Sequence, residues 1–222
     1  IFPIWIFFAR TLDRIGKGIR TGARDAMLSD QAAPETKGRI FGFHRALDTF
    51  GAVLGPILAL LYLYYYPEDY QSLFYIAFLP GVLAIGTTLV LKDNNDHRPT
   101  KATKKTPFFS FLGYWKQSTP QYRKLVSGLL AFALFNSSDI FLLLKAKEAG
   151  LGDTALIGVY IFYNLIYALF AYPLGVLADK IGVRNMFIFG LGIFSIVYFG
   201  MSASSSIYAI AGLFFLYGIY GA

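Results

Sequence analysis

Several residue types are absent or scarce in this chain of 222 residues. It has no cysteine, which excludes disulfide bridges and thiolate metal sites. Charged residues make up only 15% of the chain, whereas 56% of its residues are hydrophobic and 18% are aromatic. An ordinary soluble domain carries more charge and less apolar surface than this. The composition therefore indicates a membrane protein.

Long apolar runs recur along the whole chain. A bilayer core about 30 Å thick is crossed by a helix of about 20 mostly apolar residues. We find seven such segments, at approximately 2–27, 39–66, 72–91, 125–144, 155–178, 185–201 and from 206 onward. Because a backbone in lipid must satisfy its own hydrogen bonds, we predict an all-α, polytopic transmembrane helical bundle of about seven helices.

One polar stretch divides the seven segments. Residues 92–106 are rich in Lys and Thr and have no apolar period, and residues 108–124 mix aromatic with basic residues as interfacial segments do. We therefore predict three parts: a helical domain at 1–91, a basic linker with an interfacial segment at 92–124, and a second helical domain at 125–222.

The charge of the gaps predicts the direction of the helices. The formal net charge is +7, but the basic residues gather in alternate gaps, which argues against a nucleic-acid surface. The gap at Lys145 and Lys147 is the one mixed case. We expect an integral, multi-pass protein with its basic loops in the cytoplasm. Since no Met opens the chain and its last residues lie in an apolar run, we also expect a fragment of a longer protein.

The gap between the segments at 155–178 and 185–201 contains a motif that begins at Gly175 and continues through Asp179, Lys180, Gly182 and Arg184. It resembles the signature loop of the major facilitator superfamily, G-x-L-A-D-R-x-G-R-K, with Val183 at one of the basic positions. A glycine at 175 would permit close helix contact, and the Asp179 carboxylate could pair with cations or cap a neighbouring helix N-terminus.

Two further stretches resemble the same superfamily. Gly51, Gly55 and Pro56 match the G-x-x-x-G-P element of its exchangers, although Ala59 and Leu60 stand where that pattern has two glycines; the alternative is a glycine packing face. The runs from Asp13 to Ala26 and from Phe41 to Pro56 resemble a prokaryotic subgroup with D-R-x-G-K-G-I-R-T-A-P-R-D-A, although Gly22 and Ala23 replace its Ala-Pro.

The resemblance implies a particular numbering and function. It makes the segments helices four to six and seven to ten of a twelve-helix transporter that works by alternating access. It implies secondary transport in a prokaryotic plasma (inner) membrane, by proton-coupled efflux or antiport, with the proton gradient as energy source and no cofactor. We expect a monomer among membrane lipids, with a small solute and no nucleic acid as partner.

A charged stripe interrupts the first apolar segment. Arg10, Asp13, Arg14 and Lys17 lie three or four residues apart and so on one helical face. A lone Arg at mid-membrane costs at least about 2.5–3.5 kcal/mol, so we expect these groups to face a wet cavity and to favour an anionic or zwitterionic solute. The alternative is a structural network in which Asp13 pairs with Arg10 or Lys17.

Further polar residues lie inside the later segments. His44 and Asp48 are one turn apart, a spacing suited to proton exchange, whereas an ion pair between Arg45 and Asp48 would be the inert alternative. The other candidates for substrate or coupling roles are Asn136, Asp139 and Asn164.

Two other functional classes compete with transport. A membrane enzyme acting on phosphate or lipid groups would need a nucleophile with its base or a metal site, and the sequence pattern contains neither, so we expect no enzyme and no bound metal. A receptor or scaffold on the same fold stays open, because fold does not determine function.

Overall fold

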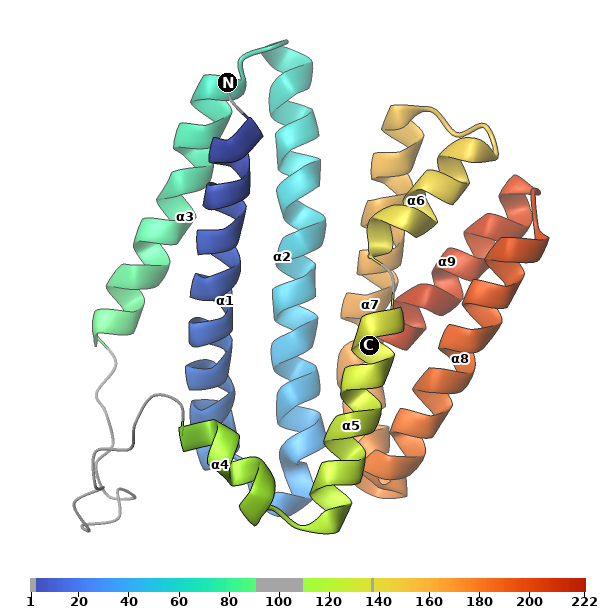
Figure 1. The fold of residues 1–222 in the computed structure, drawn as a ribbon. Coiled ribbons are helices and arrows are strands. Elements are labelled where there is room, and N and C mark those ends of the chain that lie inside the picture. Colours follow the sequence, from blue (N-terminus) through green and yellow to red (C-terminus); the bar gives the residue numbers. More distant parts are fainter. Residues whose placement is uncertain (1–2, 91–109, 137) are drawn as a thin grey trace. The chain divides into compact units, whose positions relative to one another are not determined.

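The computed structural model describes residues 3–90, 110–136 and 138–222. All regular elements in these ranges are helices, which confirms the all-α prediction (Figure 1). In chain order they are α1 (Pro3–Gln31), the short 3-10 helix η1 (Pro34–Thr36), α2 (Lys37–Tyr65), α3 (Tyr70–Val90), α4 (Ser110–Gln117), α5 (Pro120–Phe135), α6 (Asp139–Glu148), α7 (Asp153–Ile181), α8 (Val183–Ala203) and α9 (Ile207–Gly221).

Local sequence signals explain where several helices begin and end. Pro34 occupies the first turn of η1, where its missing N–H costs nothing. Thr119 caps α5 by accepting the Tyr122 N–H at 3.3 Å, with Pro120 directly after it. Glu68, at φ 63°, turns the chain between α2 and α3. Gly182, at φ 88°, alone separates α7 from α8, in a conformation that glycine adopts without steric cost.

Five helical segments in the described ranges are long and apolar enough to cross a membrane. They are Pro34–Tyr65, Tyr70–Val90, Pro120–Glu148, Asp153–Ile181 and Val183–Ala203. The other two predicted spans are helical but do not meet this measure, since α1 carries the charged stripe and α9 has only 15 residues. Length and composition thus support five of the seven predicted spans.

The predicted span at 125–144 is not one continuous helix. Asn136 ends α5 with extended backbone (φ −72°, ψ 125°), and α6 begins at Asp139. Asn and Ser side chains compete for backbone hydrogen bonds, and the Ser138 hydroxyl accepts the Ile140 N–H at 3.4 Å. Asn136 and Asp139, which both fall within the predicted span at 125–144, therefore do not lie on one continuous helix.

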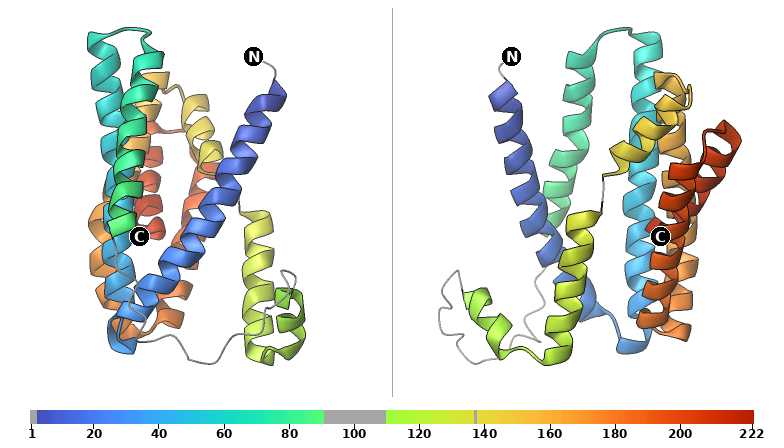
Figure 2. Two further views of the ribbon diagram at one scale, coloured as in Figure 1. Left: turned by 90° about the vertical axis from the view of Figure 1, so that its left-hand side faces the viewer. Right: turned by 45° about the vertical axis from the view of Figure 1, so that its right-hand side comes forward.

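Contacts group the chain into two compact units, Ile1–Tyr65 with Leu142–Ala222, and Tyr66–Phe141. In the first unit α7 is the central helix: it runs beside α2 and also contacts α8 and α9 (Figure 1). α1 meets α2 only near the α1 C-terminus, and Figure 2 shows it diverging toward its N-terminal end.

The core of the first unit is aromatic and aliphatic. Val197, Ile210 and Phe214 are fully buried, from α8 and α9. The ring of Tyr163 from α7 stacks on the Phe214 ring with 5.9 Å between their centroids. The centroid of the Tyr217 ring lies 5.4 Å from that of Tyr163. These contacts hold α7 against α9.

The second unit contains α3, α4 and α5. No residue of α3 is buried, although the helix is apolar along its whole length. Such a surface suits contact with lipid. Most of the predicted linker at 92–124 lies outside the described residues, so the division into domains at 1–91, 92–124 and 125–222 stays a prediction.

Candidate functional site

The Asp179 carboxylate caps the N-terminus of α2. One carboxylate oxygen accepts the Gly38 N–H at 2.7 Å, and the other accepts the Arg39 N–H at 2.9 Å. The first N–H groups of a helix have no partner within it, and the positive end of the helix dipole favours an anion there. Of the two arrangements that the sequence allowed for Asp179, the structure shows the cap.

Glycines bring the backbones of α2 and α7 together beside this cap. A Cβ added at Gly42 would lie 2.5 Å from the Ala171 carbonyl oxygen and 3.2 Å from the Cα of Gly175. A Cβ added at Gly175 would overlap the Gly38 carbonyl group. This confirms the close helix contact expected at Gly175, and it shows that any larger side chain here would push the two helices apart.

The rest of the signature segment is largely helical. Because α7 ends at Ile181 and α8 begins at Val183, Gly182 is its only residue outside a helix. Lys180 and Arg184 are exposed, and neither forms an ion pair with another described residue. The resemblance implies that this loop stabilises one of the two transport states, and that role stays a prediction.

His44 lies in a polar cluster that α1 and α2 build together. The charged groups that act on it are Arg24 and Asp25 of α1, and Arg45 and Asp48 of its own helix. Arg24 and Asp25 form an ion pair at 2.9 Å. Among the described residues Arg45 and Asp48 form none, so the inert pairing considered for them is not present.

The charged stripe of α1 is exposed where it is described. Asp13, Arg14 and Lys17 are all exposed, and Asp13 forms no ion pair with Lys17 in the described part of the chain. Only the backbone of Arg10 is described, so its pairing with Asp13 lies outside the described side chains. Of the two ion pairs considered for a structural network, the one between Asp13 and Lys17 is therefore absent from the described part of the chain.

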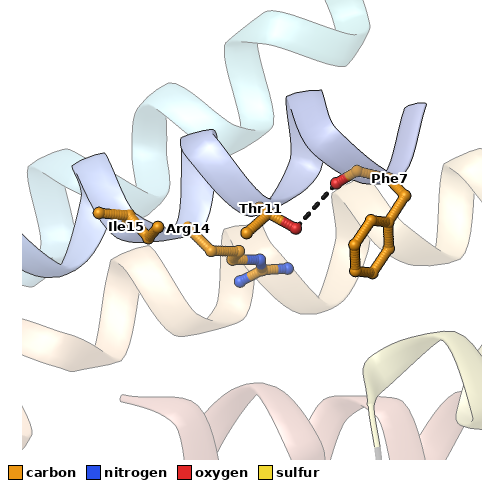
Figure 3. A pocket seen from close by; sticks show the side chains of 4 residues that line it. All are labelled: Phe7, Thr11, Arg14 and Ile15. Atoms are coloured by element: carbon orange, nitrogen blue, oxygen red, sulfur yellow. Dashed lines mark hydrogen bonds between the residues drawn. The ribbon is translucent and has the colours of Figure 1, made fainter. Parts of the chain in front are cut away.

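A shallow pocket of about 430 Å³ lies along α1 beside this stripe, lined by Phe7, Thr11, Arg14 and Ile15. Figure 3 shows Phe7 and Arg14 projecting from the same side of the helix. The Thr11 hydroxyl donates to the Phe7 carbonyl oxygen at 2.8 Å and so turns back onto its own helix. Arg14 is therefore the one charged group among the described residues that line this pocket.

The two glycines of the predicted packing element in the middle of α2 face open space among the described residues. A Cβ added at Gly51 or Gly55 would meet no atom within 4 Å. Pro56 lies inside the helix and lines an apolar pocket shared with α6 and α7. The packing role of Gly51, Gly55 and Pro56 stays a prediction, and the close contacts occur instead at Gly38 and Gly42.

The candidates of the second half belong to three different helices. Asn136 ends α5, and its N–H donates to the Phe132 carbonyl oxygen at 2.8 Å. Asp139 opens α6 as the acidic residue of its first turn. Asn164 is buried in α7, where its amide donates to the Tyr160 carbonyl oxygen at 2.8 Å. For Asn164 this geometry indicates a packing role, and nothing described brings the three side chains together.

Sequence reasoning missed some residues of the site. Gly38 and Gly42 are four residues apart at the start of α2, and this small-xxx-small spacing was a usable signal. The approach of Arg24 and Asp25 to His44 depends on the angle between α1 and α2, which no local pattern encodes. No group of three His, Asp or Glu side chains that could hold a metal ion occurs in the described ranges.

These features define a class of protein. Long apolar helices with exposed apolar side chains, joined by short polar turns, form a polytopic helical membrane protein. Its distinctive site is a glycine-lined contact between two helices, closed by the Asp179 cap.

Comparison with known sequences identifies the family. The model of the Major Facilitator Superfamily matches residues 2–222, and the chain belongs to this superfamily. Its members are transporters and not enzymes, as expected from the sequence. The chain is 35% identical over 216 residues to an uncharacterized MFS-type transporter from Methanocaldococcus jannaschii, over 94% of this chain and 52% of that protein.

More distant relatives match a shorter stretch. Uncharacterized proteins from Mycobacterium bovis and Mycobacterium tuberculosis are 33% identical over 90 residues, which is 40% of this chain and 22% of each of them. The chain thus spans about half the length of the Methanocaldococcus relative. No solved structure matches the chain significantly.

Proposed function

We propose that the whole protein is a secondary transporter that carries a small solute by alternating access. The observation that supports this most is the Asp179 cap on α2. In the numbering implied by the sequence, α2 is the fifth helix, in the first half, and α7 is the eighth, in the second half. A close contact between the halves that can open and re-form at its capped end is what two rocking domains need.

The cap can open at modest cost. Gly38, Gly42 and Gly175 meet through backbone atoms, so no large side chains interlock at these three positions. When the contact opens, water can replace the Asp179 carboxylate at the α2 N–H groups. The capped arrangement then belongs to one of the two transport states.

The charge of α1 suggests the class of solute. Arg14 and Lys17 are exposed and have no ion-pair partner among the described residues. A cation on a membrane-crossing segment must meet water, a counter-ion or a ligand. An anionic or zwitterionic solute would supply the missing negative charge.

Proton coupling is the second part of the proposal. His44 interacts electrostatically with Arg24 and Asp25 of α1 and with Asp48 of α2, so a change in its protonation alters the charge balance between α1 and α2. Asp139, at the start of α6, is the candidate for the second half. With a proton gradient as energy source, the protein would export its solute by antiport, as a monomer in a prokaryotic inner membrane with the basic loops in the cytoplasm.

Flux through proteoliposomes of the full-length protein tests the proposal. Vesicles containing a pH-sensitive dye would be offered a panel of organic phosphates, dicarboxylates and amino acids under an imposed pH gradient. We expect at least one solute to move protons. Arg14→Gln should slow that flux by about tenfold, the effect of losing one charge-assisted contact of about 1.5 kcal/mol.

Two variants separate coupling from binding. Asp48→Asn should leave solute movement but remove its dependence on the pH gradient, whereas Asp153→Asn, an exposed carboxylate in the first turn of α7, should change neither. If the gradient alters no solute's flux, the coupling is refuted. Solute binding without any flux would instead favour a receptor on the same fold.

A further inference from the structure

A pocket with one cationic side lies where the α1 C-terminus, α2 and α7 meet. Its volume is about 510 Å³, and it lies within the first compact unit. It is lined by Leu28, Arg39, Ile40, Phe43, His44, Leu47 and Tyr172. Apart from Arg39 and His44, these side chains are apolar or aromatic.

Arg39 is fixed through its backbone but not through its side chain. Its N–H donates to the Asp179 carboxylate at 2.9 Å, which holds the residue in the first turn of α2. The guanidinium group makes no hydrogen bond or ion pair with another described residue, and the residue is exposed. A planar cation in this position can bind a phosphate with two parallel hydrogen bonds.

An apolar strip continues from the pocket along α2. Its members are spaced three or four residues apart, so they share one helical face, and all are exposed: Phe43, Leu47, Phe50, Leu54, Leu58 and Leu61. The Phe43 ring also contacts the Tyr172 ring of α7 edge to face at 6.1 Å. On a helix apolar enough to cross a membrane, such a strip is a surface for hydrocarbon chains.

We propose that this pocket binds an anionic phospholipid. The phosphate group would pair with the Arg39 guanidinium, and an acyl chain would run over Phe43 and Leu47 along the strip. The arrangement of one cation at the end of an apolar strip matches the two ends of an amphiphile, whereas a free phosphate would use only the cation. Basic pockets between helices at a membrane surface bind anionic headgroups in this way.

Lipid binding to the full-length protein tests this inference. Delipidated protein in detergent would be titrated with phosphatidylglycerol or with phosphatidylcholine of the same acyl chains, and bound lipids would be counted by native mass spectrometry. We expect one site that prefers phosphatidylglycerol. Arg39→Gln should weaken that preference by about fivefold, the effect of one basic residue at an anionic surface. Arg39→Lys, which keeps the charge, should retain most of it.

Controls make each outcome decisive. Lys116→Gln removes an exposed basic residue on α4, outside the pocket, and should leave the preference unchanged. Glycerol phosphate, added in excess, should not displace the lipid. Equal loss in Arg39→Gln and Lys116→Gln, or displacement by glycerol phosphate, would overturn the proposal.

A second readout locates the lipid and does not depend on a variant that folds. Phosphatidylglycerol with a photoactivatable group in its acyl chain should label peptides that contain Phe43, Leu47 or Tyr172. Labelling confined to other peptides would mean that another part of the full-length protein covers this pocket, and would equally refute the site. Neither readout requires transport, so failure here would leave the proposed function standing.

Discussion

Removing the charge of Asp179 gives the sharpest prediction about stability. In Asp179→Asn one side-chain oxygen can still accept an N–H from α2, but the second acceptor and the negative charge are lost. A hydrogen bond to a charged group contributes about 1.5–3 kcal/mol, and a charge at a helix end about 0.3–1 kcal/mol. Because Asp179 is only half-buried, the lower values apply, and we expect a loss of about 2 kcal/mol in the free energy of unfolding.

Thermal unfolding of the full-length protein in detergent measures this loss. A change of about 2 kcal/mol corresponds to a fall of about 4 °C in Tm for a chain of this size or larger. The matched control is Asp153→Asn, whose ion pair with Lys147 at 2.7 Å is largely exposed and should contribute less than about 0.5 kcal/mol. Equal shifts for the two variants would refute the reasoning, because the cap would then contribute no more than a surface charge.

Two further predictions concern packing. Gly42→Val should lower the free energy of unfolding by about 1–3 kcal/mol or more, and with it the Tm, because its Cβ overlaps the α7 backbone. Gly51→Ala, in open space, should be neutral or stabilising. Unchanged stability in Gly42→Val would contradict the contact. Phe214→Ala should lower the free energy of unfolding, measured with denaturant, by about 3–5 kcal/mol because this residue is fully buried. The control is Tyr208→Ala, at a residue that is 90% exposed. A loss in Phe214→Ala no larger than that in the control would refute the core described for α7, α8 and α9.

The helices could largely be predicted from the sequence because their cause is local. Apolar runs of membrane-spanning length gave α2, α3, α7 and α8 to within a few residues, and Pro34 and Gly182 lie at the ends that proline and glycine favour. The break after Asn136 was missed, since the apolar run continues on both sides of it. Short Asn and Ser side chains there compete with the helix for backbone hydrogen bonds. The average hydropathy of the segment does not reveal this competition.

The site was only partly predictable, since its geometry depends on which helices pack together. Asp179 and Gly175 carried a recognisable motif, and the possibilities of a cap and a close contact followed from their chemistry. Their partners Gly38 and Arg39 lie about 140 residues earlier in the chain, and only the pairing of α2 with α7 reveals them. Likewise, the exposed guanidinium of Arg39 becomes part of a pocket only when Leu28 and Tyr172 are placed beside it.

The central claim is that the capped ends of α2 and α7 separate and rejoin during transport. Spin labels at Glu35 and Val183 can follow this, because both positions are exposed. Distances between these labels in the full-length protein, reconstituted in lipid, should fall into a short and a long population, and Asp179→Asn should shift protein toward the long one. A single distance that stays the same in the wild-type protein and in Asp179→Asn, across pH and with solute added, would contradict the account.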